Sequence, residues 1–144
     1  MKKDDEILLR QYEKMVDTTI EVTNWRQNTN NFYVTVNTGI LAIAAYLYGN
    51  TTGTGQIISL IGIAISALWH QNICYYRTLN AAKFRVIHEM ERKLPIAAFT
   101  KEHAYFTEIN PHSATKIERR IPYLFAAAYI IALIPTILHF LNIA

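Results

Sequence analysis

The stretch from Gln27 to Tyr76 constrains this chain most, because its fifty consecutive residues include no Asp, Glu, Lys or Arg. It consists of two apolar runs, 32–48 and 56–76, joined by the polar linker 49–55. One crossing of a bilayer takes about 20 apolar residues, so the stretch is long enough to cross a membrane twice. A third uncharged run follows at 121–144. We therefore expect a membrane protein rather than a soluble domain.

Charge is segregated along the chain. The 14 basic and 11 acidic side chains all lie in two blocks, 2–26 and 77–120. Because Lys and Arg concentrate on the cytoplasmic side of membrane proteins, both blocks are predicted to be cytoplasmic and the linker 49–55 to lie outside. This orientation places the N-terminus inside and the C-terminus outside. Acidic residues follow Met1-Lys-Lys directly, so we expect no signal peptide.

The pattern predicts an all-α membrane protein: one membrane domain, 1–144, with three transmembrane helices and long cytoplasmic helical extensions, assembled as a homo-oligomer. No Pro or Gly interrupts 4–38, so the first cytoplasmic helix is expected to continue into the first span. The second span should likewise continue to the residue before Pro95. The expected bounds are 4–30 for the cytoplasmic helix, 31–48 for the first span, 56–76 for the second, 77–94 for its cytoplasmic extension, 95–115 for a connector and 121–142 for the third span.

Three local features refine these elements. A heptad seam runs along the first helix and is expected to pack on the second or on another subunit, and its residues are Leu8, Tyr12, Met15, Thr19 and Val22. Residues 110–111 are expected to form an Asn-Pro turn, and 115–118 match a capping box. Pro135, inside the third span, predicts a kink that would serve as a hinge.

Motifs for catalysis are missing. His88-Glu-Met-Glu91 begins like the helix of a zinc protease, but Arg92 stands where that motif has its second histidine. The other histidines show no metal-ligand spacing, and no glycine-rich loop is present to hold a phosphate. We therefore expect no enzyme activity, no metal site and no cofactor.

A polar line enters the first span. Its members recur at steps of four, three and four and so share one helical face: Arg26, Asn30, Tyr33 and Asn37. Polar groups in hydrocarbon are costly, so they face a water-filled lumen or pair with another helix. Two interpretations stay open, a pore-lining face and interhelical hydrogen bonding by Asn37. A face of small residues on the second span predicts close helix packing, at Ser59, Gly62 and Ser66.

Aromatic and basic side chains gather near the predicted cytoplasmic interface and just beyond it. One interpretation is an ordinary aromatic belt with positive flanks. The other is a basic, aromatic-lined vestibule that binds an anionic ligand, including a single-stranded nucleic acid. The candidate ligand-binding residues are Trp25, Tyr76, Arg77, Lys83, Arg85, Arg92 and Lys93.

Three segments together resemble the RipA-type family of small octameric bacterial inner-membrane proteins. They are WRQNTNNF at 25–32 with Asn37-Thr38, YRTLNAAKFRVIHEMERKLP at 76–95, and TKIERRIPYLF at 115–125. The layout is also similar, more distantly, to small transmembrane effectors encoded beside nucleotide-generating enzymes in antiphage defence. The segment 98–114 departs from the family's aromatic-rich pattern. The resemblance implies a homo-oligomer, tetramer to octamer, in the bacterial cytoplasmic membrane.

Two functions follow as hypotheses. The first is a homo-oligomeric pore or ion channel, a bacterial defence or stress effector, controlled by a nucleotide or a single-stranded oligonucleotide at its basic cytoplasmic face. The alternative is a non-conducting membrane scaffold that recruits a cytosolic partner protein.

Overall fold

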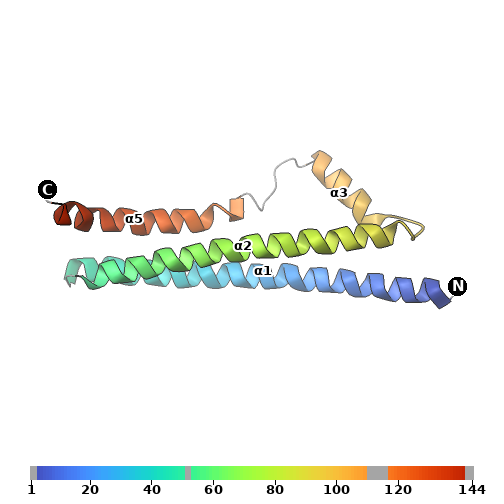
Figure 1. The fold of residues 1–144 in the computed structure, drawn as a ribbon, viewed down its shortest axis with the longest axis horizontal. Coiled ribbons are helices and arrows are strands. Elements are labelled where there is room, and N and C mark those ends of the chain that lie inside the picture. Colours follow the sequence, from blue (N-terminus) through green and yellow to red (C-terminus); the bar gives the residue numbers. More distant parts are fainter. Residues whose placement is uncertain (1–2, 51–52, 110–116, 142–144) are drawn as a thin grey trace. The chain divides into compact units, whose positions relative to one another are not determined.

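A computed structural model describes residues 3–50, 53–109 and 117–141. Within these ranges the chain is all-α, as predicted, with four helices: α1 (Lys3–Asn50), α2 (Thr54–Glu91), α3 (Ala98–Ile109) and α5 (Ile121–Phe140) (Figure 1). Helices α1 and α2 are each continuous, in agreement with the absence of Pro and Gly in 4–38 and near the end of the second apolar run at Tyr76. Helix α1 ends at Asn50 and α2 begins at Thr54, so the turn is shorter than the predicted linker 49–55.

The turn between α1 and α2 depends on a glycine. Gly53 has a φ of 88°, a conformation that side chains with a Cβ rarely adopt. Thr54 follows as the first residue of α2. Gly53 therefore supplies the positive φ directly before the first residue of α2.

Contacts divide the chain into two compact units. Unit 1 contains 1–27 and 75–115, and unit 2 contains 28–74 and 116–144. The division falls at the ends of the uncharged stretch, between Gln27 and Asn28 and again between Cys74 and Tyr75. The charged blocks and the apolar runs thus form separate packing groups.

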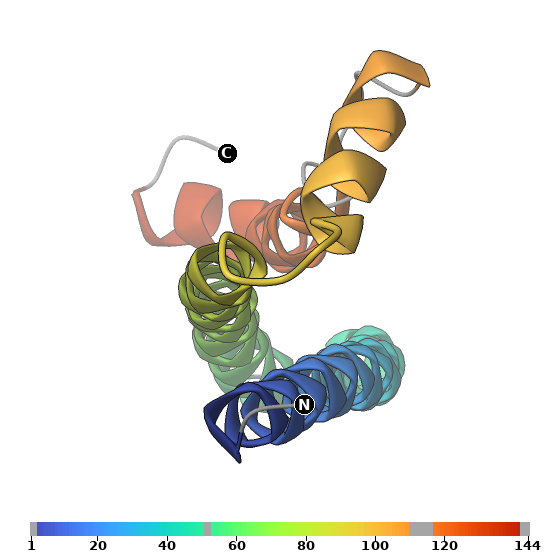
Figure 2. The same cartoon turned by 90° about the vertical axis from the view of Figure 1, so that its right-hand side faces the viewer.

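Unit 1 is built on the first part of α1 and the last part of α2, which lie side by side (Figure 2). Lys83 donates a 2.9 Å hydrogen bond to the hydroxyl of Thr18, and Tyr12 donates one of 3.2 Å to Glu91. The predicted seam faces inward at its C-terminal end, where Thr19 and Val22 are buried. Packing inside one protomer therefore covers part of this seam.

Helix α3 lies within the segment 95–115 that was predicted to be a connector. It has twelve residues, none of them buried, and begins three residues after Pro95. Its short length made it hard to recognise in the sequence. The predicted turn at 110–111 and the first half of the capping box at 115–118 lie outside the described residues.

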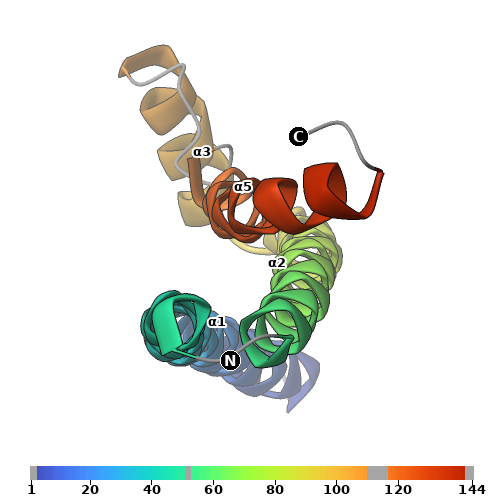
Figure 3. The same ribbon diagram turned by 90° about the vertical axis from the view of Figure 1, so that its left-hand side faces the viewer.

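Unit 2 packs the remaining parts of α1 and α2 with α5 (Figure 3). A Cβ added at Gly62 would lie 2.3 Å from the ring of Tyr129. Ser59 and Ser66 are buried on the same face of α2. These contacts confirm the prediction that small residues on the second apolar run permit close helix packing.

By length and composition, one helix among the described residues, α2, is long and apolar enough to cross a membrane. Residues 121–135 of α5 form a shorter apolar helix. Pro135 lies inside α5, which continues to Phe140. The three spans at 31–48, 56–76 and 121–142, and their orientation, remain predictions.

Candidate functional site

The polar line of α1 is bonded within the protomer. Asn30 accepts a 3.0 Å hydrogen bond from the indole nitrogen of Trp69. The hydroxyl of Tyr33 accepts one of 2.8 Å from Asn72, and its ring stacks on Trp69 with centroids 5.8 Å apart. Trp69 is only 1% exposed, so it belongs to the core of unit 2 and not to the predicted aromatic belt.

Asn37 is fully buried, and each of its polar groups has a partner. Its side-chain nitrogen donates to the carbonyl of Tyr33 at 2.9 Å, and its side-chain oxygen lies 3.0 Å from the hydroxyl of Ser66. The hydroxyl of Tyr129 donates a 2.8 Å bond to the Asn37 backbone carbonyl. Asn37 thus joins α1 to α2 and α5, which is the packing interpretation left open by the sequence. Arg26, the fourth member of the line, belongs to unit 1 and is half-buried.

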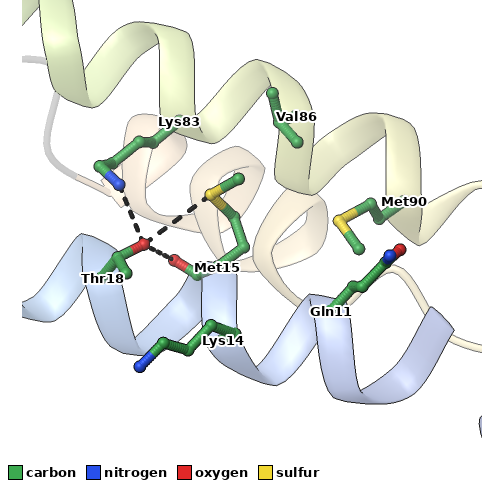
Figure 4. Close-up of a pocket in the computed structure, with 7 residues that line it drawn as sticks. All are labelled: Gln11, Lys14, Met15, Thr18, Lys83, Val86 and Met90. Atoms are coloured by element: carbon green, nitrogen blue, oxygen red, sulfur yellow. Dashed lines mark hydrogen bonds between the residues drawn. The ribbon is translucent and has the colours of Figure 1, made fainter. Parts of the chain in front are cut away.

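Unit 1 contains two adjoining hollows between α1 and α2, which we call the unit 1 groove. The first has a volume of about 520 Å³ and is lined by Gln11, Lys14, Met15, Thr18, Lys83, Val86 and Met90 (Figure 4). The second, of about 400 Å³, shares two of these residues and is lined by Leu8, Val86, Glu89, Met90, Arg92 and Lys93.

The groove combines an apolar floor with basic ends. Met15, Val86 and Met90 supply the floor, and Figure 4 shows the two methionine side chains pointing into the space between the helices. The amine of Lys83 is held at one end by its 2.9 Å bond to Thr18. The exposed Arg92 and Lys93 stand at the other end. Such an arrangement is chemically suited to an anion that carries an apolar or aromatic body.

Three of the seven predicted ligand-binding residues line this groove, namely Lys83, Arg92 and Lys93. The other four line neither hollow. Trp25 is 54% exposed, and Arg77 and Arg85 are also exposed. Tyr76 is half-buried and makes an edge-to-face contact with Tyr75, with centroids 5.6 Å apart. The structure therefore gathers Lys83, Arg92 and Lys93 in the groove and leaves Arg85 and the interfacial residues outside it.

A buried carboxylate that sequence reasoning missed connects α2 to α3. Glu91 is 2% exposed. Its two oxygens accept hydrogen bonds from the amide of Phe99 at 2.7 Å, the amide of Thr100 at 3.0 Å and the hydroxyl of Thr100 at 2.6 Å. Tyr12 adds the fourth bond from α1. Glu91 therefore caps the N-terminus of α3, where the helix dipole also favours negative charge.

Opposing effects act on the pKa of Glu91. Burial raises it, while the Thr100 hydroxyl, the amides of Phe99 and Thr100, and the Tyr12 hydroxyl lower it; the net result is a pKa below the ordinary value. Burial and the nearby Glu91 charge raise the pKa of Tyr12. The carboxylate is thus held ionised at neutral pH. A signal for this role was present in the sequence, since Glu91 is an acid four residues after the apolar Ile87 and so lies on the same helical face.

Comparison with known proteins identifies one family. The model of the octameric membrane protein family (8xMP) matches residues 9–138. No curated protein and no solved structure matches the chain.

Proposed function

The chain belongs to the octameric membrane protein family, and from this premise we propose that it forms a homo-oligomeric membrane pore controlled by an anionic ligand in the unit 1 groove. The ligand would be a nucleotide or a short single-stranded oligonucleotide. Its phosphates suit the basic ends of the groove, and its bases suit the apolar floor. A pore of this kind would act as an effector in bacterial defence or in a stress response.

One observation carries the proposal: the groove and the apolar runs lie on the same two continuous helices. Met15 and Thr18 stand on α1, which also carries Asn37 of unit 2. Lys83 and Met90 stand on α2, which among the described helices is the one long and apolar enough to cross a membrane. A ligand that changes how these helices pack in unit 1 would act directly on segments that continue into the membrane.

A ligand can control the pore only if it binds one packing state of the helices more tightly than the other. The groove offers contacts that would differ between two such states. Lys83 already has a protein partner in Thr18, so a phosphate would compete with a neutral hydroxyl for the amine. The bond to Thr18 is charge-assisted on the lysine side alone, and a phosphate would add the opposite charge on the acceptor side. Where a phosphate replaces Thr18 at the amine, α1 would be released from α2 at that point.

The proposal is tested by reconstituting the wild-type oligomer in planar bilayers. Nucleotides and oligonucleotides are added to the side that carries unit 1, and conductance is recorded before and after. We expect a conductance change that depends on ligand concentration. Lys83→Met should lose this response because it keeps the side-chain length and removes the charge, whereas Arg85→Met, an exposed basic residue that does not line the groove, should keep it.

Two results would count against the proposal. An intact oligomer that passes no ions, with or without these ligands, excludes the pore. Equal losses of response in Lys83→Met and Arg85→Met would place ligand control outside the groove.

A specific feature of unit 1 favours the alternative, a scaffold that recruits a cytosolic protein. Helix α3 exposes large apolar side chains, with Ile109 83% exposed beside Tyr105 and Phe106. Exposed apolar clusters on a helix are typical of protein contact sites. If the pore fails its test, capture of a defined cytosolic protein that is lost in Phe106→Ser would support the scaffold.

A further inference from the structure

Unit 1 contains a further hollow, which lies between α2 and α3. Its volume is about 230 Å³, and its lining consists of Phe84 of α2 and four residues of α3, namely Phe99, Glu102, His103 and Phe106. The four α3 residues recur at steps of three, one and three, so they lie on one side of that helix. None of the five lines the unit 1 groove. We call this space the aromatic hollow.

Three phenylalanine rings border the aromatic hollow. The rings of Phe84 and Phe99 meet edge to face, with centroids 6.3 Å apart and an interplanar angle of 61°. Phe99 is also held in place by Glu91, which accepts its amide at 2.7 Å, and by the ring of Tyr12. Phe106 is 58% exposed and makes no ring contact with another aromatic side chain of the described residues. Packing of α3 on α2 therefore accounts for the first two rings and leaves the third unexplained.

The charge at the aromatic hollow is negative. With histidine neutral, Glu102 is the one charged residue in its lining. Glu102 is exposed, and it makes no ion pair with the described residues. The ionised carboxylate of Glu91 adds a second negative charge nearby, because it is bonded to the amide of Phe99. Lys83 of α2 does not line the hollow and is bonded to Thr18 of α1. The local field thus favours a cation.

Aromatic rings beside a carboxylate are suited to an organic cation. The face of an aromatic ring attracts positive charge, and groups of such rings recognise quaternary ammonium ions. A quaternary ammonium has no N–H group, so a lining of phenylalanine rings leaves it no unmade hydrogen bond, whereas a primary ammonium would lose several. The volume of about 230 Å³ lies below the range of about 300–1,000 Å³ for drug-sized ligands, so the occupant is small.

We propose that the aromatic hollow binds a small, water-soluble quaternary ammonium ion. Phe84, Phe99 and Phe106 would contact its methyl groups, and Glu102 would supply the opposite charge. We favour a water-soluble ion because the hollow lies in unit 1, which contains the charged blocks of the chain. The site differs from the unit 1 groove in its residues and in the charge that it prefers, so the inference does not depend on the pore.

The probe that tests this site is choline, and its uncharged isostere 3,3-dimethylbutan-1-ol is the matched control. The wild-type oligomer is kept in a maltoside detergent, which carries no ammonium group, and the methyl proton signal of each compound is recorded by NMR. We expect an upfield shift of the choline signal, because ring currents shield protons above a ring face, and a clearly smaller shift of the isostere. No shift for choline, or equal shifts for both compounds, would overturn the proposal.

Two pairs of variants of α3 locate the binding. Phe106→Leu removes the ring and keeps an apolar side chain, and Glu102→Gln removes the charge; each should weaken choline binding at least about threefold. Tyr105→Leu and Glu108→Gln are the matched controls, because both residues are exposed on the same helix and neither lines the hollow. Both controls should bind choline like the wild type. Equal losses in Phe106→Leu and Tyr105→Leu, or unchanged binding in Phe106→Leu, would refute the site.

A final comparison identifies the source of the ammonium ion. The wild-type protein is placed in nanodiscs of phosphatidylcholine or of phosphatidylglycerol, and the choline shift is measured in both. A water-soluble occupant predicts the same shift in the two lipids. Loss of the shift in phosphatidylcholine alone would show that a lipid headgroup fills the hollow and would overturn the soluble occupant. Conductance plays no part in these readouts, so failure here is distinguishable from failure of the pore.

Discussion

The carboxylate of Glu91 accepts a 2.7 Å hydrogen bond from the backbone amide of Phe99, so a side chain near the end of α2 caps the first turn of α3. Thr100 contributes both its amide and its hydroxyl to the same carboxylate. A buried charge is tolerated only when such partners replace its hydration. Glu91 thereby attaches α3 to the rest of unit 1, together with the ring contacts that Phe99 makes with Tyr12 and Phe84.

Removal of this carboxylate should release α3. Glu91→Ala leaves two amide groups of the first turn without their acceptor, at a cost of about 3 kcal/mol. Hydrogen exchange at Phe99 and Thr100 should accelerate by at least tenfold, while exchange at Ile87, in the core of unit 1, should change little. Glu91→Gln, which keeps an acceptor, should give an intermediate result. Unchanged exchange at Thr100 in Glu91→Ala would contradict the capping role.

Acid should weaken the same attachment in the wild-type protein. Because the pKa of Glu91 is lower in the folded protein than its ordinary value of 4.5, its contribution to stability is fully present above pH 4.5 and is lost as the pH falls through the folded pKa. Exchange at the Phe99 amide, corrected for its intrinsic pH dependence, should therefore accelerate only below about pH 4.5. Glu91→Gln should abolish this transition. A transition that lies well above pH 4.5 would contradict this role of Glu91.

Substitution of Asn37 distinguishes packing from a lumen. In the structure Asn37→Leu removes the acceptor that lies 3.0 Å from Ser66. The packing interpretation predicts a modest loss of stability, about 0.6 kcal/mol for each interhelical hydrogen bond lost. Denaturant titration in detergent measures this loss. If the variant instead keeps its stability and its oligomeric state but loses conductance, Asn37 would line a pore.

The predicted membrane topology is tested by thiol labelling in intact cells. With Cys74→Ala as background, Thr52→Cys should react with an impermeant reagent because the linker is predicted to be outside. Lys101→Cys should be protected because it lies in a charged block predicted to be cytoplasmic. The reverse pattern would invert the orientation, and labelling of both positions would reject the hairpin.

Local properties of the sequence determined much of this protein. The segregated charges predicted a chain with separate charged and apolar segments. The absence of Pro and Gly at the boundaries between these segments predicted two long helices, each of which continues from a charged segment into an apolar one. The spacing of Ser59, Gly62 and Ser66 predicted close packing, because helical periodicity alone places these residues on one face. Each of these signals depends on residues within a few turns of one another.

Tertiary structure alone decided which distant groups meet. Asn37 and Tyr129 are 92 residues apart, and nothing local to Asn37 distinguishes a lumen from a tyrosine hydroxyl. The twelve-residue α3 depends on an acceptor that lies on another helix. The gathering of Lys83, Arg92 and Lys93 into one groove likewise depends on α1 lying beside α2. A hydrogen bond or a hollow forms between two surfaces. The local sequence specifies each surface separately, and folding decides which two surfaces come together.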